Sequence, residues 1–143
     1  MARAGLRAGS RPPGGVIVRA LVVDDSRVMR SMLSGILREA RFEVLEAGDG
    51  REGLEVLRRH QSTRPISLAL VDWNMPVMSG YEMVCAVRAD AALRGVRVLM
   101  ATAENGIEKV AKALAAGADE YAMKPLTREV VLEKLAILGL VVP

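Results

Sequence analysis

Five short apolar runs constrain the fold of this chain more than any other feature of its sequence. From Val16 onward they are VIVRALVV, EVLEA, SLALV, VRVLMA and the weaker EYAM. Runs of this length without polar alternation are typical of strands covered on both faces, which indicates a parallel sheet. The segments between the runs carry apolar residues at helical spacing. We therefore predict a doubly wound α/β domain, with five parallel strands and five helices joined by right-handed crossovers.

Capping residues and helical spacing locate several of the predicted helices. Asp49 with Glu52, and Ser79 with Glu82, have the spacing of an N-cap and an acidic third residue. Gly117 follows two alanines where a left-handed residue would end a helix. The predicted apolar face of the first helix comprises Met29, Leu33, Ile36, Leu37 and Ala40, and that of the fourth comprises Ile107, Val110, Ala111 and Leu114.

Composition limits the class of protein. With 143 residues, 51% of them hydrophobic, the chain can form one domain with a full core. No apolar run has the length of a membrane span, and the first residues lack the apolar region of a signal peptide, so we expect a cytoplasmic protein. The single cysteine, Cys85, excludes an internal disulfide and is predicted to lie in the core. The single histidine, His60, is predicted at a solvated helix end or loop, and the two together do not favour a zinc site.

The basic character of the chain comes from its first residues. The net charge is +3, and Arg3, Arg7 and Arg11 account for it, because the other 17 basic side chains are balanced by 17 acidic ones. A neutral folded part with few aromatic residues lacks the basic surface that nucleic acid binding requires. Residues 1–15 are rich in Gly, Ala, Arg and Pro, so we predict a disordered tail there and a folded domain over residues 16–143.

Polar residues follow four of the five predicted strands. They are Asp24 and Asp25 after the first, Asp72 after the third, Thr102 after the fourth and Lys124 after the fifth. Each alone is an ordinary turn, cap or surface residue. In an open parallel sheet, however, the carboxyl ends of the strands meet at one edge, where such folds bind their ligands. We therefore expect these five side chains to lie together.

The predicted cluster has a chemistry of its own. Three neighbouring carboxylates repel one another unless a cation lies between them. Oxygen ligands favour Mg²⁺, which commonly binds one or two carboxylates together with phosphate oxygens. Lys124 supplies a charge for an anion, and Thr102 supplies a hydroxyl donor. These groups suit phosphoryl transfer to a carboxylate nucleophile, which makes Asp72 a candidate acyl phosphate.

The motifs as a set resemble the receiver domain of two-component response regulators. They are VVDD, DWNMP followed by SG, ATAE, GADEY and MKPLT, and the resemblance covers nearly all of residues 18–138. DWNMP most resembles the single-domain chemotaxis regulators of the CheY type. The resemblance implies a flavodoxin-like fold with strand order 2-1-3-4-5. Ser26 and Ile107 differ from residues usual in that group, so the resemblance does not identify a flagellar target.

The resemblance also implies roles for individual residues. Asp72 would be the phosphoacceptor, Asp25 a direct Mg²⁺ ligand, and Asp24 an acid acting on the metal largely through water. Asn74 would offer its backbone carbonyl to the metal. The remaining implied roles are the switch residues Thr102 and Tyr121, the phosphate-pairing Lys124 with a cis bond to Pro125, and the hydrolysis-tuning positions Asn74 and Glu104, whose polar groups predict a short-lived phosphoryl state.

The expected function is phosphorylation-dependent signalling by a response regulator that is not an enzyme on external substrates. A histidine kinase would donate the phosphoryl group, and an unidentified protein target would bind the surface of the fourth helix, fifth strand and fifth helix. Only five residues follow Leu138, so we expect output by binding, without an attached domain. A phosphorelay intermediate is an alternative. Three other classes fit the sequence less well. A Mg²⁺-dependent aspartyl phosphohydrolase would need a second acid where Trp73 and Asn74 stand. A flavodoxin-like cofactor binder would need a phosphate-binding first loop, and an unphosphorylated docking module would not need the intact cluster.

Overall fold

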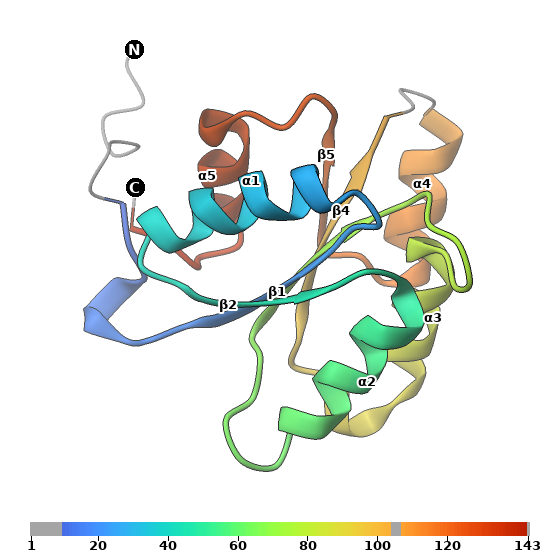
Figure 1. The fold of residues 1–143 in the computed structure, drawn as a ribbon, viewed down its shortest axis with the longest axis horizontal. Helices are drawn as coiled ribbons and strands as arrows, with labels where there is room; N and C mark the ends of the chain where they lie inside the picture. The colour runs from blue at the N-terminus through green and yellow to red at the C-terminus, as the bar shows by residue number, and fades with distance from the viewer. Residues whose placement is uncertain (1–9, 104–106, 143) are drawn as a thin grey trace.

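The computed structural model describes residues 10–103 and 107–142, and these form one parallel sheet with helices on both faces (Figure 1). The strands are β1 Arg19–Val23, β2 Glu43–Ala47, β3 Leu68–Asp72, β4 Arg97–Thr102 and β5 Glu120–Met123. They pair in the order β2-β1-β3-β4-β5, and every pairing is parallel. The predicted doubly wound fold and its strand order are therefore confirmed.

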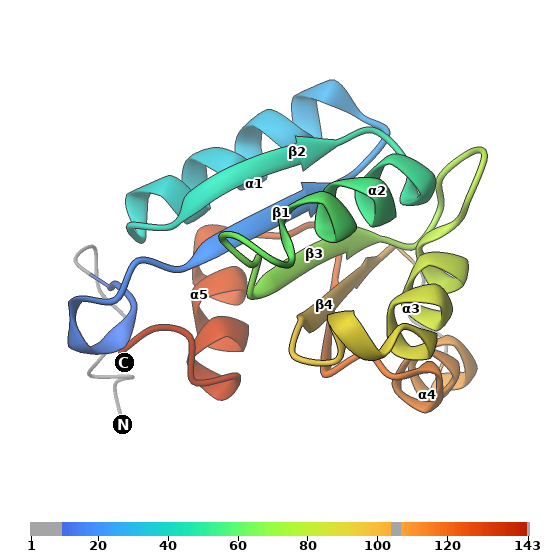
Figure 2. The same ribbon diagram turned by 90° about the horizontal axis from the view of Figure 1, so that it is seen from below.

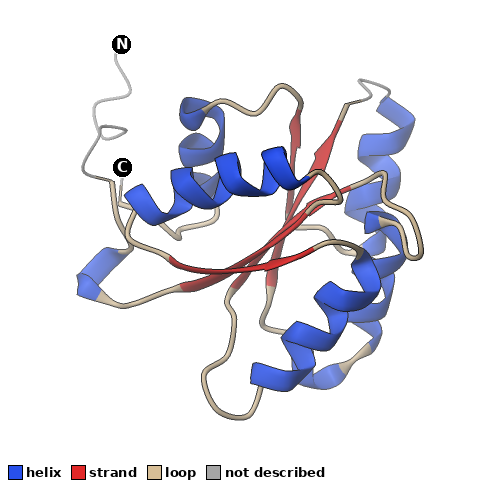
Figure 3. Cartoon of the chain, in the orientation of Figure 1, coloured by secondary structure: helices blue, strands red, loops and turns tan. Residues whose placement is uncertain are grey.

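Helices cover the two faces of the sheet unequally. Figures 2 and 3 show α1 and α5 on one face and α2, α3 and α4 on the other. The bounds are α1 Arg27–Glu39, α2 Gly50–His60, α3 Gly80–Ala89, α4 Ile107–Ala116 and α5 Arg128–Ile137, with short 3-10 turns at Pro13–Gly15 and Ala91–Leu93. His60 is the last residue of α2 and is partly exposed, as predicted. No helix in the described part of the chain is both long and apolar enough to span a membrane.

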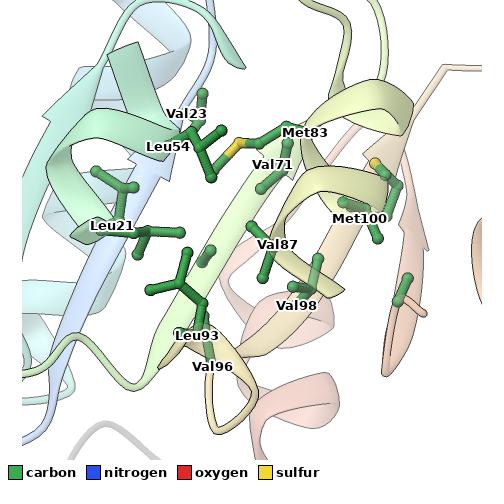
Figure 4. Close-up of a cluster of buried hydrophobic side chains, with 14 of the residues drawn as sticks. Leu21, Val23, Leu54, Val71, Met83, Val87, Leu93, Val96, Val98 and Met100 are labelled. Carbon is green, nitrogen blue, oxygen red and sulfur yellow. The ribbon is translucent and has the colours of Figure 1, made fainter. Parts of the chain in front are cut away.

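Two buried clusters, one on each face, explain why the strands lack polar alternation. Leu21 and Val23 of β1 belong to the cluster under α2, α3 and α4 (Figure 4). Ala20 and Val22 of the same strand belong to the cluster under α1 and α5. Because successive side chains of a strand point to opposite faces, a strand with a core on each side must be apolar at every position.

The predicted helix signals are present in the structure. The Asp49 side chain accepts a hydrogen bond from the Glu52 N–H at 2.9 Å. Ser79 and Glu82 form a reciprocal capping box, since each side chain accepts from the backbone N–H of the other. Gly117 has a φ of +115° just after α4. These local interactions fix where α2 and α3 begin and where α4 ends.

Two predictions about burial are wrong. The face of α4 predicted to be buried is open, with Ile107 84% and Leu114 44% exposed, and Ala113 is buried instead. The opposite side of the helix carries lysines: Lys109 Nζ lies 5.2 Å from the centroid of the Trp73 ring. Lysine stems can cover apolar surface while their charges stay near water, so this face of α4 packs without a hydrophobic stripe.

Cys85 is the second correction. It is exposed on α3, not part of the core. The buried residues of this helix are Gly80, Met83, Val84 and Val87, and Cys85 follows Val84 by one position, which turns it away from that face. The apolar residues around Cys85 do form a buried stripe on α3, but Cys85 lies outside it.

Residues just before β1 are partly ordered against the C-terminal end of the described chain. Ser10 is buried, and the Val142 N–H donates to the Arg11 carbonyl at 2.8 Å. The disordered tail predicted over residues 1–15 falls partly on residues 1–9, which lie outside the described residues.

Candidate functional site

The strand ends bring three carboxylates together. Asp24 and Asp25 follow β1, and Asp72 is the last residue of β3, the neighbouring strand. One ligand oxygen from each of the three lies within 4.8 Å of the other two. Asp24 and Asp72 are buried and Asp25 is exposed. The sequence argument therefore placed these acids at the correct edge of the sheet.

Lys124 completes the cluster from the end of β5. Its Nζ lies 2.8 Å from Asp72 Oδ1 and 3.7 Å from Asp24 Oδ2. Its backbone N–H donates to the carbonyl of Thr102 at 2.8 Å, so the last residue of β4 is tied to the same edge. Thr102 is itself only 2% exposed. The Lys124–Pro125 bond is cis, as expected.

Hydrogen bonds of Trp73 with β4 and with the first residue of α3 fix the backbone next to Asp72. The Trp73 N–H donates to the Ala101 carbonyl, and the Trp73 carbonyl accepts from the Gly80 N–H, both at 2.9 Å. A Cβ at position 80 would collide with the main-chain oxygen of Asp72. Only glycine therefore lets α3 begin this close to the strand end.

The loop between β3 and α3 holds a strained residue. Val77 has a φ of +68°, and the Met78 N–H donates to the Pro76 carbonyl across it at 2.8 Å. This is a γ-turn with a β-branched residue at its centre, a conformation that such residues rarely adopt. Asn74 lies in the same loop, two residues after Asp72, and is exposed. The chain thus takes a constrained path beside the acidic residues.

Burial and like charges disfavour the ionised form of Asp72. Burial raises the pKa of Asp72 above its usual value, and Asp24 and Asp25 act in the same direction, although the hydrogen bond from Lys124 opposes them. For Lys124, burial lowers the pKa, but the hydrogen bond to Asp72 and the neighbouring carboxylates outweigh burial and raise it. The site therefore holds more negative charge than its one lysine compensates.

An atom of Asp24 lacks the partner that burial normally requires. Asp24 Oδ1 accepts from the Ser26 N–H at 2.8 Å, but Asp24 Oδ2 is buried and accepts no hydrogen bond from the residues that the structure describes. The Lys124 ammonium, 3.7 Å away, is too distant to donate a hydrogen bond to this oxygen, so a closer cation would stabilise it. Three carboxylates with an unsatisfied oxygen fit an oxygen-ligated divalent cation such as Mg²⁺. The residues present thus fit the predicted metal.

The predicted switch residues lie on the neighbouring strands. Tyr121 of β5 pairs with Met100 of β4 and packs against the core cluster under α3 and α4. Lys134 Nζ of α5 lies 4.9 Å from the centroid of its ring. Glu104, the second predicted hydrolysis-tuning position, lies outside the described residues.

Two sets of side-chain contacts near the site were not predicted. Arg30 of α1 donates to the main-chain oxygen of Asp24 at 2.7 Å. Trp73 stacks on Tyr81, with ring centroids 5.6 Å apart, and Lys109 and Lys112 of α4 lie over the two rings. Lys109 and Lys112 are three residues apart and so lie on one side of α4, but no sequence pattern identified their aromatic partners.

Comparisons with known proteins agree with this geometry. A family model described as the response regulator receiver domain matches residues 20–136. The chemotaxis protein CheY1 of Helicobacter pylori is 39% identical over 121 residues, which cover 84% of this chain and 95% of that protein. The chemotaxis protein CheY of Pseudomonas aeruginosa is 38% identical over 119 residues, covering 82% and 93%.

Solved structures give the same result. The chemotaxis response regulator CheY4 of Vibrio cholerae superposes with a TM-score of 0.79 at 36% identity, covering 86% of this chain and 99% of that one. A chain from the CheX-CheY-BeF3-Mg+2 complex of Borrelia burgdorferi also gives a TM-score of 0.79, at 27% identity, covering 87% and 91%.

Proposed function

The chain belongs to the response regulator receiver family, and on that basis we propose that it accepts a phosphoryl group on Asp72 from a histidine kinase and signals by phosphorylation-dependent protein binding. The observation that carries the proposal is that one ligand oxygen each of Asp24, Asp25 and Asp72 lies within 4.8 Å of the other two, while the buried Asp24 Oδ2 accepts no hydrogen bond from the described residues. Lys124 supplies one positive charge to three carboxylates, and a divalent cation would compensate the remaining negative charge.

Asp25, Asp72 and the Asn74 carbonyl would hold the Mg²⁺, with Asp24 acting on it largely through water. The bound ion would neutralise the charge of the carboxylates and of the transferring phosphoryl group. Lys124 already contacts both buried carboxylates and would pair with a phosphoryl oxygen. A beryllofluoride and Mg²⁺ complex of a relative at 27% identity supports this assignment.

In the proposed reaction an Asp72 oxygen attacks the phosphorus of a phosphohistidine. A P–O bond forms as the P–N bond breaks, and the histidine nitrogen leaves with the electron pair. The return loop through Gly80 holds the Asp72 main chain in place. The chain would act only on itself, by promoting its own phosphorylation and its hydrolysis, with Asn74 and Glu104 setting the lifetime.

The added charge would act on Thr102 and Tyr121. The phosphoryl group carries about 1.5 to 2 negative charges and would draw the Thr102 hydroxyl toward it. Tyr121 would then fill the vacated space, and its contact with Lys134 of α5 would change. Couplings of this kind are typically about 1–3 kcal/mol, enough to alter the affinity of the α4, β5 and α5 surface for a partner.

The proposed partners are a cytoplasmic histidine kinase and a protein target, with no role for nucleic acid or membrane. The relative in the CheX-CheY complex binds another protein in its beryllofluoride form, which supports output by protein binding. The described part of the site does not favour an aspartyl phosphohydrolase, because the buried Trp73 and the exposed Asn74 follow Asp72 where that class needs a second acid.

Intact-mass measurement after incubation with acetyl phosphate tests the proposal. With Mg²⁺ the wild-type chain should gain the mass of one phosphoryl group, and it should gain none with EDTA. Asp72→Asn should gain none under either condition. An unshifted wild-type mass, or equal modification of Asp72→Asn, would show that the assigned chemistry is wrong.

A further inference from the structure

Arg30 contacts the backbone of the acidic cluster at Asp24. It projects from the first turn of α1, and its Nη1 donates to the main-chain oxygen of Asp24 at 2.7 Å. Its side chain is only 20% exposed. The same Nη1 would lie 3.7 Å from a Cβ at Gly48, so Arg30 also borders the loop that follows β2. One guanidinium thus spans the ends of two neighbouring strands.

Two further side chains hold Arg30 in this position. Arg30 Nε lies 3.4 Å from Glu46 Oε1 of β2. The other oxygen of that carboxylate, Oε2, accepts from the hydroxyl of Ser34 at 2.8 Å. Ser34 is fully buried on α1, one turn after Arg30. The guanidinium is therefore anchored to a strand and, through Ser34, back to its own helix.

These contacts complete the fixing of Asp24. Its N–H donates to the Ala47 carbonyl at 3.2 Å, its Oδ1 accepts from the Ser26 N–H, and its carbonyl accepts from Arg30. Within residues 10–103 and 107–142, Oδ2 accepts no hydrogen bond, and it lies 3.7 Å from Lys124 Nζ. Fixing the carbonyl also fixes the peptide plane that leads to Asp25, the proposed direct ligand.

We infer that Arg30 is a positioning residue for the metal site: it locks the Asp24–Asp25 turn so that both carboxylates face Asp72, and Glu46 and Ser34 hold it there. The inference rests on the proposed function, because it concerns the same Mg²⁺. Side chains that orient the ligands of a metal commonly change its affinity by about 10- to 100-fold when they are removed.

A positioning role and a purely electrostatic role of Arg30 predict opposite changes in Mg²⁺ affinity when Arg30 is removed. Arg30 is a cation beside a cation site, so by charge alone its removal would strengthen Mg²⁺ binding. If Arg30 holds the turn, its removal weakens binding although it relieves repulsion. Glu46 already offsets much of the Arg30 charge, which makes the electrostatic effect small and the positional effect dominant.

The test is Mg²⁺ titration by calorimetry of the wild type, Arg30→Met, Arg30→Lys and Ser34→Ala, with unfolding curves for each. Arg30→Met should bind Mg²⁺ about 10- to 100-fold more weakly than the wild type. Arg30→Lys keeps one donor for the Asp24 carbonyl and should recover part of the loss. Ser34→Ala changes no charge, so any weakening must come from the position of Glu46 and Arg30.

Arg27→Met is the matched control. Arg27 is exposed at the start of the same helix, and its guanidinium makes no ion pair or hydrogen bond with the described residues. Removing its charge should leave Mg²⁺ affinity unchanged or slightly increased. This separates a general charge effect on α1 from the specific contact of Arg30.

The outcomes distinguish the inference from the proposed function. If the wild type binds Mg²⁺ and Arg30→Met binds it equally or more tightly, the positioning role is wrong while the proposed function stands. If Arg30→Met does not fold, Arg30→Lys and Ser34→Ala decide, and wild-type affinity in both overturns the inference. If the wild type does not bind Mg²⁺, both the proposed function and the positioning role are wrong.

Discussion

Replacing Asp72 by asparagine should stabilise the protein when no divalent ion is present. The ligand oxygens of the three aspartates lie within 4.8 Å of one another. At an effective dielectric constant of about 20, two unit charges at that distance repel by about 3.5 kcal/mol, so Asp24 and Asp25 together oppose the Asp72 charge by about 7 kcal/mol. The attraction between Lys124 Nζ and the Asp72 carboxylate, at 2.8 Å, offsets this by about 6 kcal/mol at the same dielectric constant.

Repulsion and attraction at Asp72 nearly cancel, and burial then disfavours its ionised form. Asp72 is 6% exposed, and burial is the largest cause that raises its pKa. Asparagine keeps the shape and can still accept the hydrogen bond from Lys124. We therefore expect Asp72→Asn to raise the free energy of unfolding in EDTA by about 1–3 kcal/mol. Saturating Mg²⁺ should favour the wild type again, because the ion stabilises the chain that binds it more tightly.

Chemical denaturation at neutral pH, with EDTA and with Mg²⁺, measures both effects. Asp90→Asn is the matched control, because the hydrogen bonds to Asp90 from Arg58 and the Ala92 N–H lower its pKa, and the same substitution there should destabilise the protein. If Asp72→Asn destabilises the Mg²⁺-free protein as Asp90→Asn does, the charge balance derived for the site is incorrect.

Three further predictions follow from the same geometry. Because the pKa of Asp72 is raised in the fold, its ionisation opposes folding at neutral pH, and the stability advantage of Asp72→Asn in EDTA should shrink as the pH falls toward the ordinary value of 3.8; an advantage that grows toward acid pH would contradict this. Gly80→Ala forces a Cβ onto the Asp72 main chain and should destabilise the protein by about 1–3 kcal/mol, whereas Gly35→Ala, in open space on α1, should stabilise it by about 0.5–1 kcal/mol in thermal unfolding. Trp73 is buried beside Asp72, so its fluorescence should change on addition of Mg²⁺ or beryllofluoride in the wild type but not with Mg²⁺ in Asp25→Asn, and an unresponsive wild type would argue that the site does not assemble.

The positions of the site residues were predictable because strand ends obey simple geometry. Asp24, Asp72 and Thr102 follow runs of apolar residues, and in a parallel sheet all such ends lie on one edge. The N-caps Asp49 and Ser79 were predictable for a similar reason, since their partners lie three residues away. Information of this kind is local in sequence or fixed by topology.

Contacts between side chains from distant elements were not predictable. On α4 the sequence shows an apolar stripe through Ile107 and Leu114, yet the buried residue of the helix is Ala113. The ammonium groups of two α4 lysines lie over the aromatic rings of Trp73 and Tyr81. Periodicity identifies the apolar face of a helix but not which face meets the protein. The contact of Arg30 with Asp24 and Glu46 depends on side-chain reach across α1 and two strands, which no spacing in the sequence encodes.

Titration of Mg²⁺ into the wild type and Asp25→Asn by isothermal calorimetry tests the central claim most directly. Asp25 is the exposed member of the cluster, so its substitution removes a proposed ligand without disturbing the core. We predict saturable binding of one ion per wild-type chain, and affinity reduced by more than about tenfold in Asp25→Asn. Absence of binding by the wild type, or equal affinity in the two proteins, would contradict the claim that these carboxylates share a divalent ion.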